Sequence, residues 1–158
     1  MRVFISYRRQ DSAAWASRLF DALSSRYGPR EIFLDAANIS VGLDWRHYIE
    51  DAIAKSDAVL AVIGPHWLDA GYRDQVRRRI DDPDDLVRSQ LRAAIELKKT
   101  LVPVLVGGAT MPSPDMLPDD IRSLANHEGA SLRDTTWNED IARLTTVLEA
   151  PGDSARFR

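Results

Sequence analysis

The stretch VFISYRRQDS, residues 3–12, joins a short apolar run directly to two adjacent arginines. The run VFIS is continuous rather than alternating, which is typical of a strand covered on both faces in a parallel sheet. In open parallel sheets, ligands bind beyond the carboxyl ends of the strands. Arg8 and Arg9 follow this strand, so they are predicted to lie at that rim, where guanidinium groups suit a phosphate. The alternative is that both charges are solvated and pair with nearby acids.

Apolar runs and helical patterns alternate along the rest of the chain. Three more runs are predicted strands: 31–35, 58–64 and 100–107. Four segments with apolar residues at helical spacing are predicted helices: 12–27, 45–55, near 81–98 and 138–149. This alternation predicts an α/β fold with a parallel sheet flanked by helices on both faces. Pro103 cannot donate to a strand ladder and is expected near a strand start or an irregular edge.

Acidic and hydroxyl side chains mark the expected helix starts. Asp11 or Ser12 is available to cap the first helix, and Asp44 the second. Asp82 is expected to cap the third, with Pro83 in its first turn.

The length, composition and net charge of the chain exclude several classes of site and partner. The 158 residues fit one domain, predicted over 1–150, with 151–158 as a linker or frayed tail. There is no cysteine, and the three histidines lack ligand spacing, so no metal is expected. A net charge of −3 argues against nucleic acid. No apolar run is long enough for a membrane span or a signal peptide, so we expect a cytoplasmic protein with no membrane partner.

Gln90 is a polar residue on an apolar stripe. The stripe of the third helix consists of Leu86, Val87, Leu91, Ala94 and Ile95. Gln90 lies three residues after Val87 and four before Ala94, so it is predicted to point inward, where an amide needs partners. It is either a satisfied core glutamine or a residue that faces a pocket from the first turns of the helix.

The connector LDAANISVGLDW, residues 34–45, is long for its position between a strand and a helix. Long loops at a binding rim tend to be functional, and Gly42 permits a positive φ, although an ordinary connector remains the alternative. Trp45 is either core or a stacking platform. Common nucleotide-binding and hydrolase motifs are absent, namely GxGxxG, GxxxxGK[ST] and GxSxG.

Four segments together resemble Toll/interleukin-receptor (TIR) domains over about residues 1–150. VFISYRRQDS resembles the first box of that family. IFLDAANISVGLDWRHYIEDAIAKSDAVLAVIGPHWL resembles the segment from its second to its third strand, including the BB loop, as in bacterial members. DDLVRSQLRAAIELKKTLVPVLVGG resembles the next helix and strand, and SLRDTTWNEDIARLTTVL the closing segment. The resemblance implies a flavodoxin-like fold with five parallel strands.

The resemblance implies one of two activities. Many bacterial TIR domains cleave the nicotinamide–ribose bond of NAD, giving ADP-ribose or a cyclic product, often in antiphage defence. Others are non-enzymatic modules that assemble with further TIR domains and recruit partners. NAD is then a substrate or ligand rather than a prosthetic group, and a sensor or effector is a possible fused or separate partner. A weaker alternative is a nucleoside deoxyribosyltransferase-like enzyme, which shares the architecture and uses a glutamate.

Residue roles follow from the same resemblance. The implied substrate-binding residues are Tyr7, Arg8, Arg9, Asp35 and Trp45. The implied assembly residues of the BB loop are Ile39, Ser40, Val41 and Gly42. The family's catalytic glutamate ends a VxxE pattern, which here reads VRSQ, so Gln90 takes that position. Leu86 stands where some active members carry an aromatic residue, and Glu96 points elsewhere around the helix.

Glutamine at this position predicts impaired chemistry. Loss of nicotinamide leaves positive charge on the ribose, as in glycoside cleavage, which a carboxylate would stabilise. Two unit charges about 4 Å apart interact by ~4 kcal/mol at an effective dielectric near ~20. That energy is worth roughly a thousandfold in rate. The chain is therefore expected to bind a dinucleotide better than it cleaves one, whether the glutamine is natural or an engineered near-isostere.

Overall fold

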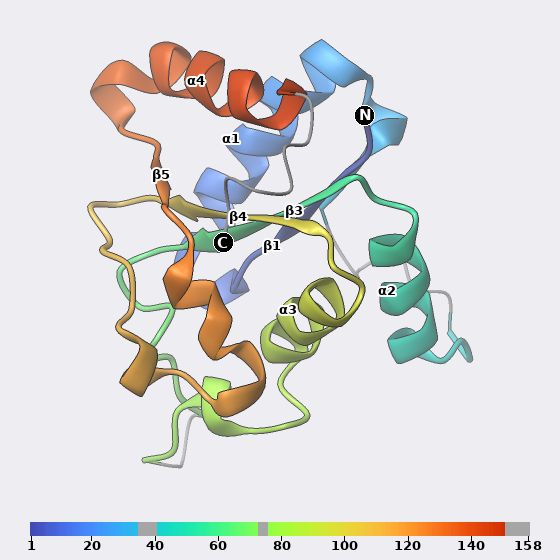
Figure 1. Ribbon diagram of the computed structural model, residues 1–158, viewed down its shortest axis with the longest axis vertical. Coiled ribbons are helices and arrows are strands. Elements are labelled where there is room, and N and C mark those ends of the chain that lie inside the picture. Colours follow the sequence, from blue (N-terminus) through green and yellow to red (C-terminus); the bar gives the residue numbers. More distant parts are fainter. Residues whose placement is uncertain (35–40, 73–75, 151–158) are drawn as a thin grey trace.

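A single parallel sheet organises the protein. The structure, a computed structural model, describes residues 1–34, 41–72 and 76–150. Its strands are β1 (Val3–Ser6), β2 (Ile32–Phe33), β3 (Ala58–Ile63), β4 (Thr100–Leu105) and β5 (Ala130–Ser131). They are all parallel and follow the order β2-β1-β3-β4-β5, which confirms the flavodoxin-like α/β prediction (Figure 1).

Four α-helices cover the two faces of the sheet. They are α1 (Arg9–Tyr27), α2 (Trp45–Ala54), α3 (Leu86–Glu96) and α4 (Trp137–Glu149). Helices α1 and α4 lie on one face, and α2 and α3 on the other (Figure 1). No helix within the described ranges is long and apolar enough to cross a bilayer.

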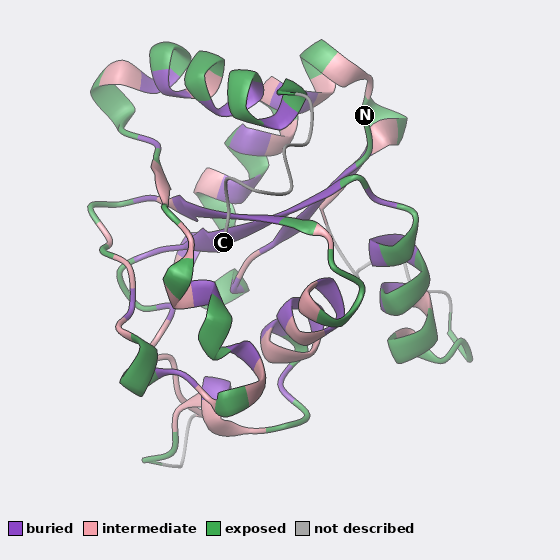
Figure 2. Ribbon diagram, viewed as in Figure 1, coloured by how far each residue is buried: buried purple, intermediate pink, exposed green. Residues whose placement is uncertain are grey.

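Strand residues alternate between the two cores. Leu60 and Val62 of β3 pack in the cluster that contains α1 and α4, whereas Val59, Ala61 and Ile63 pack in the cluster that contains α2 and α3. The central strands β1, β3 and β4 therefore bury both faces, as the colouring of the sheet in Figure 2 shows. This is why the apolar runs in the sequence are continuous rather than alternating.

The predicted start of the first helix is wrong. Helix α1 begins at Arg9, and Ser12 interrupts it with non-helical angles of φ −140° and ψ 25°. Asp11 does not cap the helix. Its carboxylate instead accepts hydrogen bonds from the backbone N–H groups of Gly64 (2.9 Å) and His66 (2.7 Å). Asp11 thus ties the beginning of α1 to the loop that follows β3.

The start of the third helix also differs from the prediction. Asp85, rather than Asp82, is its N-cap and accepts a hydrogen bond from the N–H of Arg88 at 3.0 Å. Pro83 consequently lies before the helix, and Asp82 accepts from the N–H of Asp84 at 2.9 Å. At the second helix the prediction is confirmed, because the Asp44 side chain accepts from the N–H of Arg46 at 3.0 Å.

Pro103 lies inside β4 rather than at its start. It is in register with Ala61 of β3, and the pairing with β5 begins one residue later, at Val104. The proline therefore precedes the stretch of β4 that is bonded on both sides. This placement accounts for a residue without an N–H donor in an interior strand.

Candidate functional site

A cavity of about 360 Å³ lies between the carboxyl end of β1 and the first turns of α3. Its lining residues are Ile5, Tyr7, Arg8, Arg9, Leu34, Arg79, Asp85, Leu86, Val87 and Gln90. Strand β1 lies between β2 and β3, so the chain order reverses at this position. Such a switch point is where open α/β sheets bind ligands. The structure therefore brings the two arginines, Tyr7 and Gln90 to one cavity.

Arg8 is committed to a buried ion pair. Its two terminal nitrogens donate to the two carboxylate oxygens of Asp85, each at 2.9 Å. The side chains are only 4% and 5% exposed. Pairing with an acid was the alternative left open by the sequence, and Arg8 adopts it. The Nε of Arg8 is buried without a hydrogen-bond partner in the described ranges, so a donor remains that a ligand oxygen would satisfy.

Asp85 joins two elements because it both caps α3 and holds Arg8. Its Oδ2 accepts from the N–H of Arg88 and from Arg8, whereas Oδ1 accepts from Arg8 alone. The pair fixes the residue after β1 to the first turn of α3. Sequence reasoning missed this role, although several acids before the helix were a signal that one of them could meet an arginine.

Gln90 points into the protein, as its position on the apolar stripe predicts. It is 5% exposed, and its Oε1 accepts a hydrogen bond of 2.7 Å from the hydroxyl of Ser6. Ser6 is the last residue of β1 and is itself buried. Gln90 also lines the cavity. Gln90 is therefore both a core glutamine with a hydrogen-bond partner and a residue that faces a cavity.

Two further arginines border the cavity with different surroundings. Arg9 is exposed at the start of α1. Arg79 is partly buried in a short 3-10 helix, η3 (Arg79–Asp81). The guanidinium of Arg79 lies 4.9 Å from the ring centre of Tyr72, and its Nε donates to the carbonyl of Gly71 at 3.3 Å. Sequence reasoning missed Arg79, since nothing in the run Arg77–Arg79 distinguishes its members.

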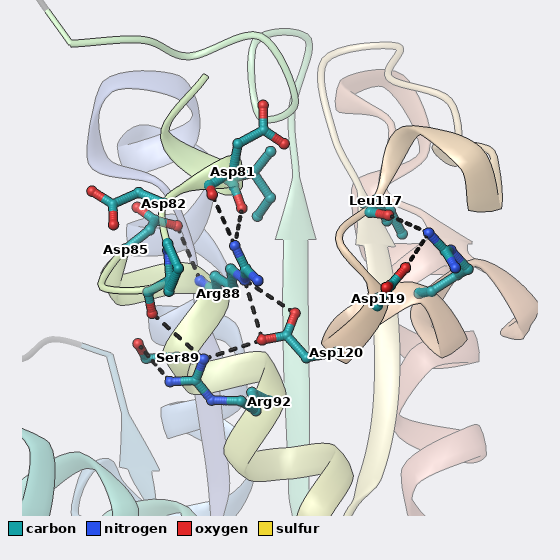
Figure 3. A network of polar contacts seen from close by, with 12 residues as sticks. Asp81, Asp82, Asp85, Arg88, Ser89, Arg92, Leu117, Asp119 and Asp120 are labelled. Carbon is teal, nitrogen blue, oxygen red and sulfur yellow. Dashed lines mark hydrogen bonds and ion pairs between the residues drawn. The ribbon is translucent and has the colours of Figure 1, made fainter. Parts of the chain in front are cut away.

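An ionic network anchors the segment before α3 (Figure 3). Arg88 donates to both carboxylate oxygens of Asp120, at 3.0 and 3.2 Å, and Arg92 donates to Oδ2 at 3.1 Å. Arg88 also donates to the carbonyl of Asp81 at 3.0 Å. Burial raises the pKa of Asp120, but the hydrogen bonds from the two arginines outweigh it and hold this pKa below its usual value. The charged Asp120 therefore helps to fix the segment that carries Arg79 and Asp85.

Other predicted site residues lie elsewhere. Trp45 lines a separate small cavity between α2 and α3, and it is not among the residues around Gln90. Asp35, Ile39 and Ser40 fall outside the described residues. The remaining predicted loop positions are exposed, and Gly42 has the positive φ of 92° that its residue type permits.

Guanidinium, carboxylate and amide groups line the cavity, and they suit an anionic ligand with hydroxyl groups. Among the residues that the structure describes, no group of three or more His, Asp or Glu side chains is placed to hold a metal ion.

Comparisons with known proteins agree on one family. A family model described as a TIR domain matches residues 3–145. The NAD(+) hydrolase tir-1 of Caenorhabditis elegans is 30% identical over 128 residues, which is 80% of this chain and 12% of that protein. The NAD(+) hydrolase sarm1 of Drosophila melanogaster is 27% identical over 131 residues, or 82% and 9%. The chain thus spans about a tenth of the length of these relatives.

Solved structures share the fold. The TIR domains of the activated Roq1 resistosome, which recognizes the pathogen effector XopQ, align with a TM-score of 0.66 at 15% identity, over 93% of this chain and 98% of that one. A metazoan TIR-STING receptor from C. gigas, in complex with 2′,3′-cGAMP, aligns with a TM-score of 0.56 at 23% identity, over 94% and 39%. At these identities the likeness concerns the fold alone.

Proposed function

The chain belongs to the TIR domain family, and we propose that it descends from NAD-cleaving members and carries glutamine at the position of their catalytic glutamate. The observation that carries this proposal is the cavity that Gln90 shares with Arg8, Arg9 and Asp85 at the switch point of the sheet. Relatives named NAD(+) hydrolases support the lineage. A cytoplasmic role in bacterial defence, with a fused or separate sensor, belongs to the same proposal.

The proposed reaction breaks the bond between nicotinamide and the ribose carbon. Nicotinamide leaves with the bonding electron pair, and the positively charged ribose is captured by water, with loss of a proton, or by a nucleophile of the same ligand. A carboxylate at position 90 would oppose that charge, whereas the amide of Gln90 only preserves hydrogen bonding. The hydroxyl of Ser6, 2.7 Å from Oε1, would donate equally well to a carboxylate. The site therefore has room and a partner for glutamate.

Gln90→Glu is the decisive substitution. We expect it to raise nicotinamide release from NAD by roughly a thousandfold, since a charge of opposite sign about 4 Å from the ribose is worth ~4 kcal/mol. Nicotinamide is measured by chromatography at high protein concentration. Gln90→Ala is the matched control, because it changes the same side chain without adding charge and should give no gain. Absence of turnover in both the unchanged chain and Gln90→Glu would contradict the enzymatic proposal.

A second candidate function is assembly without catalysis. The observation that favours it is the exposed apolar tip before α2, where the side chains of Val41 and Leu43 are 106% and 57% exposed on either side of Gly42. Adjacent exposed apolar side chains mark contact surfaces more often than isolated ones do. This candidate is compatible with the first, because contact between copies and binding in the cavity use different residues.

A further inference from the structure

We propose that Arg79 is a specificity-determining residue that contacts the diphosphate of the dinucleotide in the cavity that it lines together with Arg9. This inference rests on the proposed function. It adds a residue that lies far from the β1 arginines in the sequence and that the run Arg77–Arg79 does not distinguish.

The charge around the cavity supports a ligand with more than one negative group. Three arginines and one aspartate line it. Asp85 accepts both terminal nitrogens of Arg8, so this pair is internally neutral. Arg79 adds a guanidinium that no carboxylate in the described ranges neutralises, and Arg9 contributes a second one from the start of α1. A dinucleotide carries one negative charge on each of its two phosphates, which two guanidinium groups from different elements can contact.

Contacts of its backbone, its Nε and its guanidinium face fix Arg79 in place and leave its two terminal nitrogens available to a ligand. The N–H of Arg79 donates to the carbonyl of Ala70 at 2.8 Å, and Nε donates to Gly71. The face of the guanidinium packs on Tyr72, whose hydroxyl donates to Asp82 at 2.8 Å. In the described part of the chain, its two terminal nitrogens make no hydrogen bond, and Arg79 forms no ion pair. Such a preorganised fork loses little freedom when it meets a phosphate.

The neighbouring arginines are used differently. Arg78 forms two hydrogen bonds of 2.8 Å to the carboxylate of Asp81 and a third to the carbonyl of Met116. Arg77 donates to the carbonyl of Asp81 and does not line the cavity. Arg79 therefore differs from both, because it borders the cavity without a carboxylate partner in the described ranges.

The test measures ligand binding to the unchanged chain and to Arg79→Gln, Arg79→Lys and Arg77→Gln by calorimetry. The ligands are NAD, ADP-ribose and nicotinamide riboside, which has no phosphate. We expect Arg79→Gln to weaken NAD and ADP-ribose about tenfold, as for one charge-assisted contact. Arg79→Lys should lose less, and Arg77→Gln should bind normally. The salt dependence of NAD binding should also fall in Arg79→Gln, with no change for nicotinamide riboside.

The outcomes separate this inference from the proposed function. Equal weakening of all three ligands, or an unchanged salt dependence, would mean that Arg79 acts only through the fold and would overturn the inference. Unchanged NAD affinity in Arg79→Gln, while the unchanged chain binds NAD, would overturn the inference and leave the proposed function standing. Failure of the unchanged chain to bind either NAD or ADP-ribose would overturn both.

Discussion

At the scale of single residues, two adjacent arginines take different roles. Arg8 is sealed in an ion pair with Asp85, whereas Arg9 stays at the surface. The alternation of strand residues contributes to this, because Phe4 faces α3 and Ser6 and Arg8 follow at intervals of two. The guanidinium that sequence reasoning assigned to a ligand thus organises the site from inside.

Asp85→Ala should destabilise the protein strongly. The substitution leaves the Arg8 guanidinium buried without its partner and removes the cap of α3, for a combined loss of about 3–5 kcal/mol in the free energy of unfolding. Urea denaturation followed by circular dichroism measures the change.

Asp84→Ala is the matched control for that prediction. Asp84 pairs with Arg46 at 2.8 Å, but the two side chains are 76% and 57% exposed. We expect a loss of about 0–1 kcal/mol for such a surface pair. Similar losses in the two variants would show that burial of the Arg8–Asp85 pair contributes nothing.

The candidate site could be predicted from the sequence only in part. Helical spacing was enough to predict that Gln90 points inward, since the period of a helix fixes the face of each residue. Its partner Ser6 lies 84 residues away, and the partner of Arg8 lies 77 residues away. Such pairings depend on how α3 is placed against β1, which no local pattern encodes.

At the scale of elements, the helix starts show the same limit. Four aspartates precede α3, and local preferences alone favoured Asp82 followed by Pro83. Asp85 caps the helix instead, and the same carboxylate pairs with Arg8. At α1, the carboxylate of Asp11 binds the loop after β3 instead of capping the helix. In both cases a contact with a distant segment determines what the carboxylate of the aspartate binds. Tertiary structure therefore overrides the local capping preference.

The loop before α2 carries the prediction about assembly. Val41→Asp should abolish concentration-dependent self-association, because it places a charge on a fully exposed apolar side chain of the proposed contact. The melting temperature should stay unchanged, since that residue is fully exposed. Light scattering over a range of protein concentrations measures the association.

Val147→Asp provides the comparison for the loop variant. It makes the same chemical change at an exposed position of α4, where Val147 is 45% exposed. It should leave association intact. A chain that is monomeric at every concentration, or equal loss of association in both variants, would contradict assembly through the loop.

At the scale of the whole molecule, the alternation of apolar runs and helical patterns in the sequence was sufficient to predict a parallel sheet. The three longer runs correspond to β1, β3 and β4, which lie side by side in the middle of the sheet and are covered by helices. The shorter run 31–35 contains β2. The last strand, β5, has two residues and no apolar run, so only the family resemblance implied a fifth strand. A strand of two residues outside an apolar run leaves no pattern, unlike β2, which lies in the apolar run 31–35.

The carboxyl ends of α1 and α4 are joined by one ionic cluster. Glu149, at the end of α4, accepts from Arg26 at 2.6 and 2.8 Å and from the hydroxyl of Tyr27 at 2.8 Å, both at the end of α1. The hydrogen bond from Arg26, followed by that from Tyr27, lowers the pKa of Glu149 from 4.5 to about 2. Burial, the hydrogen bond to Glu149 and its charge raise the pKa of Tyr27 to about 12.

This cluster gives a pH-dependent contribution with a defined sign. Because folding lowers the pKa of Glu149, the folded state binds fewer protons than the unfolded state between pH 2 and 4.5. Its contribution is complete above about pH 4.5 and is lost as the pH falls to about 2. Glu149→Gln should therefore melt a few degrees below the unchanged chain at pH 7. The difference should shrink as the pH falls through that window, and in high salt, because the pair is exposed. Calorimetric melting of both proteins across the pH range measures it, and a difference that does not change with pH would show that the ion pair is not its source.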